Sequence, residues 1–244
     1  NMELQHHIKC KPGDLGRSVL LPGDLERARL ISTYMDNPRH VASSREFNTY
    51  TGAYQGVPVS VISTGVGAPS ASIVVEEAIK VGARNMIRVG TCGALQPEVR
   101  PGDLVIATAA VRGDGTTPEY IDMSYPAVAD FHLVRALVDA ADEFGASYHL
   151  GVIRTHDAFY VESPFAHGDY RARTAHWTEA NVLAVENEAS AIFVISSLRG
   201  CAGACLLVPA GNLLTGEEIK HPDEISRAID LMIRVALRAA AKMG

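Results

Sequence analysis

The chain has 244 residues, of which 47% are apolar and 20% are charged, and its formal net charge is -6. An acidic balance argues against a general nucleic-acid binder, and no apolar run reaches the roughly 18 residues that a membrane span needs. The N-terminal segment lacks the apolar core of a signal peptide. The four cysteines form no CxxC pair, so we expect reduced thiols, no metal site and a cytoplasmic protein.

Short β-branched runs alternate with amphipathic stretches along the chain. In chain order, the pattern predicts strands at 18–21, 57–64, 85–91, 103–111, 149–155, 182–186 and 204–209. It predicts helices at 25–35, 71–82, 131–145, 189–200 and 223–243. Alternation of this kind is typical of a largely parallel sheet covered by helices. Without a repeat or a linker, the chain is expected to form one α/β domain over residues 1–244.

Several of the predicted strands end in a polar or glycine-rich turn. Ligands of open α/β sheets bind beyond the carboxyl ends of the strands. The segments of interest are therefore 21–27, 63–70, 88–95, 156–160, 185–190 and 208–212.

An arginine inside an apolar strand marks the segment 88–95. Arg88 is followed by Gly90, Thr91 and Gly93. A buried arginine is costly unless it meets an anion. The glycines leave backbone N–H groups free and the Thr91 hydroxyl adds a donor, which together favour an oxyanion cradle. The alternative is that Arg88 pairs with a core carboxylate such as Glu76, and spacing alone does not separate the two.

Two glutamates lie in the apolar segment AVENEASAIF (184–193). A carboxylate rarely enters a core without a partner, because the loss of its water costs several kcal/mol or more. One interpretation is that Glu186 and Glu188 are delivered to a pocket at a strand end. The alternative is a carboxylate that binds backbone amides, followed by a glutamate favoured by the dipole in the first turn of a helix.

Five segments together resemble the nucleoside phosphorylase family, in the branch of hexameric purine nucleoside phosphorylases and uridine phosphorylases. In chain order they are VLLPGDLERARLI, STGVGAPSASIVVEEAI, IRVGTCGAL, DAFY and VENEAS. The resemblance implies a mixed sheet curled into a distorted barrel with surrounding helices. It implies pentosyl transfer, in which inorganic phosphate as co-substrate cleaves a nucleoside to free base and (deoxy)ribose 1-phosphate. It implies no metal or organic cofactor, and a homohexamer, a trimer of dimers whose sites are shared between subunits.

The resemblance also implies a role for individual residues. The phosphate site would comprise Gly23, Arg27, Arg45, Arg88 and Thr91, with Arg45 reaching the site of a neighbouring subunit. The ribose site would comprise Glu188, which accepts hydrogen bonds from the 2′- and 3′-hydroxyls, with Asn187 and with His7 of a neighbour. The base site would comprise Phe159, Glu186, Gly93, Gly211 and Asn212, with Arg88, Glu188 and Asn212 as the catalytic residues.

Two departures from the family pattern bear on the substrate. Asn187 stands where the family usually has methionine, and Gly211 and Asn212 stand where the purine enzymes place an acid. Asn212 can still hydrogen-bond N7 of a 6-oxopurine. Uridine phosphorylases read uracil with a glutamine and an arginine near the FY motif. Here no glutamine follows Phe159 closely, and Arg171 and Arg173 come late.

The expected substrates are therefore purine nucleosides. The alternatives are uridine, then methylthioadenosine, a nucleosidase that uses water, or a catalytically weak nucleoside-binding protein.

Overall fold

The computed structural model describes residues 3–163, 165 and 167–244. Its strands are β1 (Ser18–Leu21), β2 (Asp36–Ser44), β3 (Phe47–Tyr54), β4 (Val57–Ile62), β5 (Asn85–Ala94), β6 (Leu104–Gly113), β7 (Ala127–Val128), β8 (Tyr148–His156), β9 (Ala184–Glu186) and β10 (Ala202–Asn212). Its helices are α1 (Leu25–Ser32), α2 (Ala68–Lys80), α3 (Thr117–Tyr120), α4 (Phe131–Glu143), α5 (Tyr170–Glu179), α6 (Ala189–Leu198) and α7 (Pro222–Lys242), with a 3₁₀ turn η1 (Phe159–Glu162).

The sheet closes on itself at one end. Strands β10, β6, β8, β9 and β5 are neighbours in that order, and β5 also pairs with β10, which completes a ring. From β5 the sheet continues through β1 and β4 to the β3–β2 hairpin. Pairs such as β5–β10 and β6–β8 are parallel, whereas β10–β6 and β5–β9 are antiparallel. The expected distorted barrel of a mixed sheet is confirmed, and the sheet is less parallel than the strand–helix alternation predicts.

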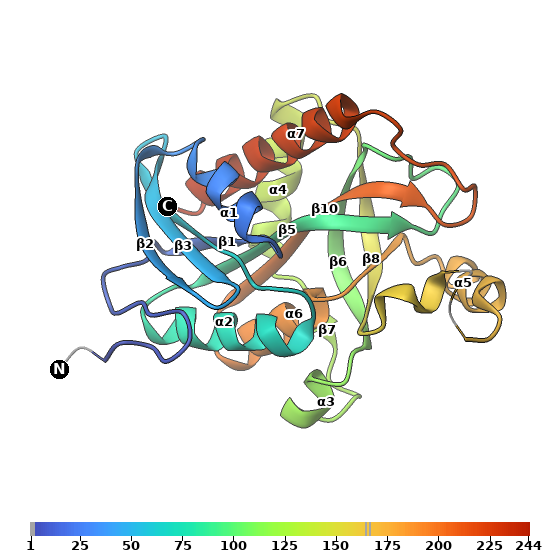
Figure 1. The fold of residues 1–244 in the computed structure, drawn as a ribbon, viewed down its shortest axis with the longest axis horizontal. Coiled ribbons are helices and arrows are strands. Elements are labelled where there is room, and N and C mark those ends of the chain that lie inside the picture. Colours follow the sequence, from blue (N-terminus) through green and yellow to red (C-terminus); the bar gives the residue numbers. More distant parts are fainter. Residues whose placement is uncertain (1–2, 164, 166) are drawn as a thin grey trace.

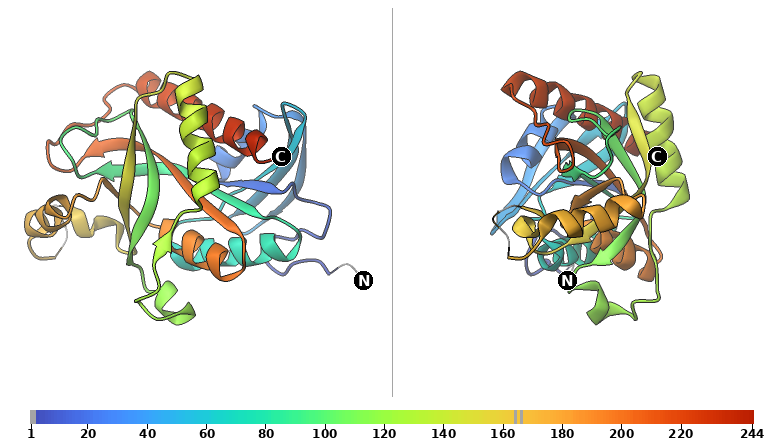
Figure 2. Two further views of the ribbon diagram at one scale, coloured as in Figure 1. Left: turned by 180° about the vertical axis from the view of Figure 1, so that it is seen from behind. Right: turned by 90° about the vertical axis from the view of Figure 1, so that its right-hand side faces the viewer.

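Helices cover the sheet on two sides. In Figure 1, α7 lies above the strands and contacts α4, which lies behind them, whereas α2 and α6 lie together below them. Figure 2 shows the same two layers from behind and from the side. Each layer buries its own apolar cluster, with Val74 and Ile192 in the cluster of α2 and α6 and Leu137 and Ile233 in that of α4 and α7. The barrel end, marked by α5 in Figure 1, extends beyond both layers.

Most predicted elements exist, with shifted ends. The main difference is the β2–β3 hairpin over residues 36–54, where no element was expected. Its turn is closed by Arg45 in a left-handed conformation, with φ of 56°, which few residues other than glycine adopt. The strand predicted at 85–91 is also longer than expected, because β5 continues to Ala94 and takes in nearly all of the segment 88–95.

Among the described residues, no helix has the length and apolar character that crossing a membrane requires.

Candidate active site

A cavity of about 1020 Å³ opens at the barrel end, where β1, β5, β8, β9 and β10 finish. Most of the residues predicted for the site line this one cavity: Gly23, Arg27, Arg88, Thr91, Gly93, Phe159, Glu186, Asn187, Glu188, Gly211 and Asn212. The first and last of them, Gly23 and Asn212, are 189 residues apart in sequence. The strand-end segments singled out in the sequence therefore meet in one place at these residues.

Arg88 lies at the floor of the cavity between two carboxylates. Its Nε donates to Glu186 Oε2 at 2.7 Å, and its Nη2 lies 2.8 Å from Glu188 Oε2. The side chain of Arg88 is 6% exposed. Burial lowers the pKa of the guanidinium, but the charges of Glu188 and Glu186 outweigh that effect and raise it above its ordinary value. Arg88 is therefore a permanent cation held in a fixed orientation.

The alternative pairing of Arg88 with Glu76 is wrong. Glu76 lies on α2 and pairs with Arg199, whose Nη2 is 2.8 Å from Glu76 Oε1. The core carboxylates that meet Arg88 are instead the two glutamates of the segment 184–193.

Glu186 holds the site together. Besides Arg88, its carboxylate accepts hydrogen bonds from the Thr155 hydroxyl and from the backbone N–H groups of Glu188 and Ala189 at 2.9 and 3.0 Å. These amides are at the start of α6, where backbone donors have no partner within the helix. The alternative of a strand-end carboxylate on backbone amides thus describes Glu186, and its acceptor sites are directed at the protein rather than at a base edge.

Glu188 makes fewer contacts with the protein. Its Oε1 accepts from the backbone N–H of Gly67 at 2.8 Å and its Oε2 faces Arg88. Glu188 is the N-cap residue of α6, next to the first turn that the alternative proposed, but its side chain makes no capping hydrogen bond to the helix. Burial raises the pKa of Glu188 above its ordinary value, and the charge of Arg88 opposes that shift. Each carboxylate oxygen has two acceptor sites, which leaves Glu188 able to accept from a ligand.

The segment around Gly90 is a strand and not a free turn. Gly90 and Thr91 of β5 are paired with Leu207 and Val208 of β10, so the backbone there belongs to the sheet. On the other edge of β5, the pairing with β1 ends at Arg88 and the pairing with β9 begins at Gly93. Within the described part of the chain, that edge has no strand partner over residues 89–92, and the expected cradle of backbone N–H groups stays a prediction. Gly90 is also needed for another reason, because a Cβ at this position would lie 2.7 to 2.9 Å from the guanidinium atoms of Arg88. The exposed Thr91 lines the cavity and offers its hydroxyl as a further donor.

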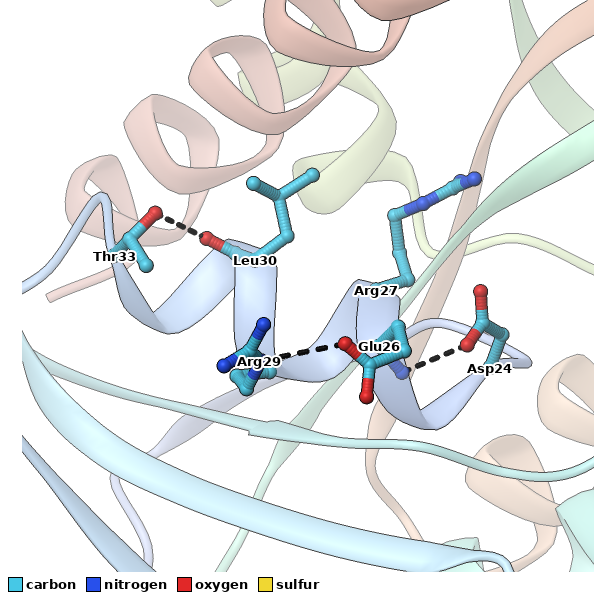
Figure 3. Close-up of a pocket in the computed structure, with 6 residues that line it drawn as sticks. All are labelled: Asp24, Glu26, Arg27, Arg29, Leu30 and Thr33. Carbon is cyan, nitrogen blue, oxygen red and sulfur yellow. Dashed lines mark hydrogen bonds and ion pairs between the residues drawn. The ribbon is translucent and has the colours of Figure 1, made fainter.

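Arg27 is the second cation of the cavity. It projects from the first turn of α1, as Figure 3 shows, and in that view no interaction joins its guanidinium to the other residues drawn. No ion pair to Arg27 is found among the described residues, although Arg29 on the same helix pairs with Glu26. Burial lowers the pKa of Arg27, and the nearby charge of Asp24 opposes that shift. A half-buried arginine without a partner is suited to an anionic ligand.

Asn187, between the glutamates, is anchored to the end of β8. Its Nδ2 donates to the backbone carbonyl of His156. The one side-chain hydrogen bond of Asn187 among the described residues is this donation, which leaves the amide oxygen without a protein donor, and Asn187 lines the cavity. The bond fixes the amide, so the oxygen is presented as an acceptor where methionine would offer only apolar surface.

Asn212 is bound on all sides by two loops, its own and the connection between β5 and β6. Its Nδ2 donates to the carbonyls of Gln96 and Val99 at 2.8 and 3.0 Å. Its Oδ1 accepts from the backbone N–H groups of Leu214 and Thr215 at 2.9 and 3.0 Å. Both amide hydrogens are therefore used, and the expected donation to N7 of a purine is corrected to a structural role in the loop.

The aromatic residues of the FY motif are at the rim. Phe159 is 67% exposed and Tyr160 is 68% exposed, and their rings meet edge to face with 5.0 Å between centroids. Since Phe159 lines the cavity, its face is free to lie against a planar ring. The neighbouring Arg173 donates to the backbone carbonyls of His167 and Val161 and is not part of the wall.

His7 and Arg45 lie outside the cavity of their own chain. Glu77 fixes His7, because its carboxylate accepts from the His7 backbone N–H and lies 2.7 Å from Nδ1 of the ring. Arg45 is exposed at the tip of the β2–β3 hairpin. These are the two residues that the resemblance assigns to a neighbouring subunit.

Sequence reasoning missed several polar residues of the wall, among them His156 and Glu162. His156 ends β8, directly before the DAFY motif, so the strand-end rule pointed to its position but not to its side chain. Glu162 ends η1, a turn that the sequence pattern did not predict.

Comparisons with known proteins agree with this geometry. The profile of the phosphorylase superfamily matches residues 17–242. A uridine phosphorylase of Thermococcus kodakarensis is 43% identical over 220 residues, which is 88% of this chain and 79% of the relative. A guanosine phosphorylase of Halorubrum lacusprofundi is 34% identical and covers 99% of this chain and 100% of its own length.

Among solved structures, a uridine phosphorylase from Vibrio fischeri superposes with a TM-score of 0.91 at 31% identity, covering 99% of this chain and 98% of that one. The match in sequence and fold spans nearly the whole chain, including every segment that lines the cavity. This chain therefore belongs to the phosphorylase superfamily, as a nucleoside phosphorylase.

Proposed function

We propose that this chain catalyses the reversible phosphorolysis of uridine, giving uracil and ribose 1-phosphate. Phosphorolysis is supported by two arginines at the cavity floor. Arg88 is fixed there between two carboxylates, and Arg27 lies close by without a partner. The identity of the base rests on the relatives, since the uridine phosphorylase of Thermococcus kodakarensis has the higher identity, 43% against 34% for the guanosine enzyme. This replaces the purine preference that the missing glutamine suggested.

Guanosine is the second candidate, on a specific observation. Among the described residues of the cavity wall there is no glutamine, and the arginines next to the FY turn, Arg154 and Arg173, do not line the cavity. The uracil-reading pair expected of the uridine type is therefore not found at the wall. A guanosine phosphorylase is also among the relatives, and its match extends over 100% of its length.

The mechanism follows from the development of charge on the sugar. Cleavage of a glycosidic bond passes through an oxocarbenium-like transition state. Phosphate held by Arg27, Arg88 and Thr91 would stabilise that positive charge and then bond to C1′. Glu188 would accept hydrogen bonds from the 2′- and 3′-hydroxyls and hold the ring over the phosphate. Since Arg88 is already oriented by Glu186, little reorganisation accompanies the reaction.

The charge balance of one chain supports a shared site. At the cavity, Arg27 and Arg88 face the carboxylates of Asp24, Glu186 and Glu188, so a phosphate dianion would meet too little positive charge. Arg45 on the exposed hairpin of a second copy would supply more, and His7 would reach the 5′-hydroxyl end of the ribose. We propose a homohexamer built as a trimer of dimers, with each site completed by its dimer partner.

A substrate panel tests the proposed reaction. Uridine, thymidine, guanosine, inosine, adenosine and methylthioadenosine are each incubated with the purified protein, with and without phosphate. Phosphate-dependent release of uracil at the highest kcat/KM supports the proposal. If guanosine has the highest kcat/KM instead, the protein is a guanosine phosphorylase. Tight nucleoside binding without any base release would overturn both candidate functions.

Mixing two inactive variants tests the shared site. Arg45→Ala and Glu188→Gln damage opposite halves of a shared site, so a mixed dimer has one site with both defects and one intact site. Co-expression should restore roughly a quarter of the parent activity, because half of the dimers are mixed and half of their sites are intact. No recovery in dimers shown to be mixed would mean that each site is built from one chain.

A further inference from the structure

The base end of the cavity carries a buried carboxylate that the mechanism above does not use. Glu162 closes the 3₁₀ turn η1, is 4% exposed and lines the cavity. Side chains at i and i+3 of a 3₁₀ turn lie on the same side, so Glu162 shares a side with Phe159, the ring expected against the base. Glu162 is thus placed below the rim, near the edge of a base that lies on Phe159.

The carboxylate of Glu162 is held firmly. Arg154 Nη1 donates to Oε1 at 2.7 Å, and the Thr174 hydroxyl lies 3.1 Å from Oε2 and 2.8 Å from the Tyr170 carbonyl, between which its one hydrogen is shared. The guanidinium of Arg154 is fixed in turn, with its central carbon 4.8 Å from the centroid of the Trp177 ring. Each carboxylate oxygen has two acceptor sites, so both keep one open. A carboxylate supported in this way is a preorganised acceptor.

His156 provides a polar group at the same end. It is 5% exposed, lines the cavity and is held through its backbone carbonyl by Asn187. Its Nδ1 is buried without a hydrogen-bond partner among the described residues, although buried polar atoms are normally paired. Burial, followed by the charge of Arg154, lowers the pKa of His156. A neutral imidazole carries one N–H donor and one acceptor nitrogen.

We propose that Glu162 and His156 read the edge of the base and select bases in which a ring N–H lies next to a carbonyl. Glu162 accepts from N3–H of uracil or N1–H of a 6-oxopurine, and His156 donates to the neighbouring carbonyl oxygen. Cytosine and adenine present an unprotonated ring nitrogen and an amino group instead, so a lone pair would face the carboxylate. The pair takes the place of the glutamine and arginine expected of the uridine type.

This inference rests on the proposed function and narrows its substrate class. It explains how one site would suit uridine and guanosine alike while rejecting cytidine and adenosine. A site built around a substrate N–H discriminates strongly against an analogue that lacks it, because its own buried groups are then left unpaired.

The test measures specificity ratios in Glu162→Gln. The substituted amide replaces one acceptor oxygen with a donor, which suits cytosine and adenine better. The ratio of kcat/KM for uridine over cytidine, and for inosine over adenosine, should fall by roughly tenfold to a hundredfold. If Glu162 only connects η1 to β8, the kcat/KM values for all four nucleosides fall by a common factor and their ratios stay the same. Unchanged ratios would therefore overturn the inference. Glu76→Gln is the matched control, since it breaks a glutamate–arginine pair away from the cavity and should leave the ratios unchanged.

A second measurement uses the unmodified protein, so that it stands even if Glu162→Gln fails to fold. In 3-deazauridine a C–H replaces N3–H and a hydroxyl replaces the neighbouring 4-carbonyl, so both groups that the pair would recognise are changed with little change of shape. Its kcat/KM should be roughly tenfold to a hundredfold below that of uridine, and equal values overturn the inference.

The proposed function and the reading of the base by Glu162 and His156 would be overturned by different results. If no nucleoside releases its base with phosphate present, the proposed function is wrong. If uridine or guanosine is cleaved but the unmodified protein accepts cytidine and adenosine equally well, only the reading by Glu162 and His156 is wrong.

Discussion

Replacing each of the paired glutamates by glutamine should separate a structural carboxylate from a ligand-binding one. Glu186 accepts from Arg88, Thr155 and two backbone amides at the start of α6. Glutamine keeps one acceptor oxygen and turns an NH₂ group toward these donors. Breaking a buried ion pair costs about 3 to 5 kcal/mol, because the remaining charge is left without compensation. In a chain of this size, that is a fall in Tm of roughly 10 °C.

Glu188→Gln should lower the catalytic efficiency more than the thermal stability. It loses only the contacts to Arg88 and to the Gly67 amide, and Arg88 keeps Glu186, so its Tm should fall by less than half as much. Its kcat/KM for the nucleoside should fall roughly a hundredfold, because hydrogen bonds from two sugar hydroxyls to a charged group are lost. For Glu186→Gln, the phosphate KM should rise instead, since Arg88 loses its orientation.

The assay combines thermal melting with initial rates in which nucleoside and phosphate are varied in turn. A parent-like Tm for Glu186→Gln, or a greater loss of stability in Glu188→Gln, would refute the structural role of Glu186. Equal effects of both variants on the nucleoside KM would refute the assignment of Glu188 to the ribose.

Three further substitutions test single contacts. Gly90→Ala places a methyl group within 2.9 Å of the Arg88 guanidinium, so the phosphate KM should rise at least roughly tenfold; an unchanged KM would contradict the close approach. Arg27→Met should raise the phosphate KM while unfolding free energy changes by less than about 0.5 kcal/mol, whereas the exposed Arg29→Met on the same helix should leave that KM unchanged. Asn187→Met should lower the unfolding free energy by about 1 kcal/mol, because the His156 carbonyl loses its donor, and a higher Tm would count against the anchor.

The sequence pattern predicted the elements that bury an apolar face. Strand β1 and helix α4 are within two residues of their expected bounds, because their periodicity reflects burial directly. The β2–β3 hairpin was missed, since β2 is largely exposed and polar and its turn has Arg45 where glycine is usual. Helix α5 was missed as well, because only Thr174 of its residues is buried and no apolar stripe marks it.

The sequence predicted which residues belong to the site better than it predicted which residues contact one another there. Strand-end segments and the family resemblance identified Arg88 and Glu188, which meet as expected. Which carboxylate would hold Arg88 depended on how β5, β9 and α6 close around it, and Glu76 was an equally good partner by spacing alone. Asn212 shows the same limit, because its four hydrogen bonds depend on the path of a loop that residue types do not reveal.

The most direct test of the account identifies the sugar product. Uridine and guanosine are each incubated with the purified protein in phosphate buffer and in phosphate-free buffer, and ribose 1-phosphate and free ribose are measured beside the base. Base release is expected only with phosphate, with one ribose 1-phosphate for each base released. Base release in phosphate-free buffer, or free ribose as the product, would contradict a phosphate site built on Arg27 and Arg88.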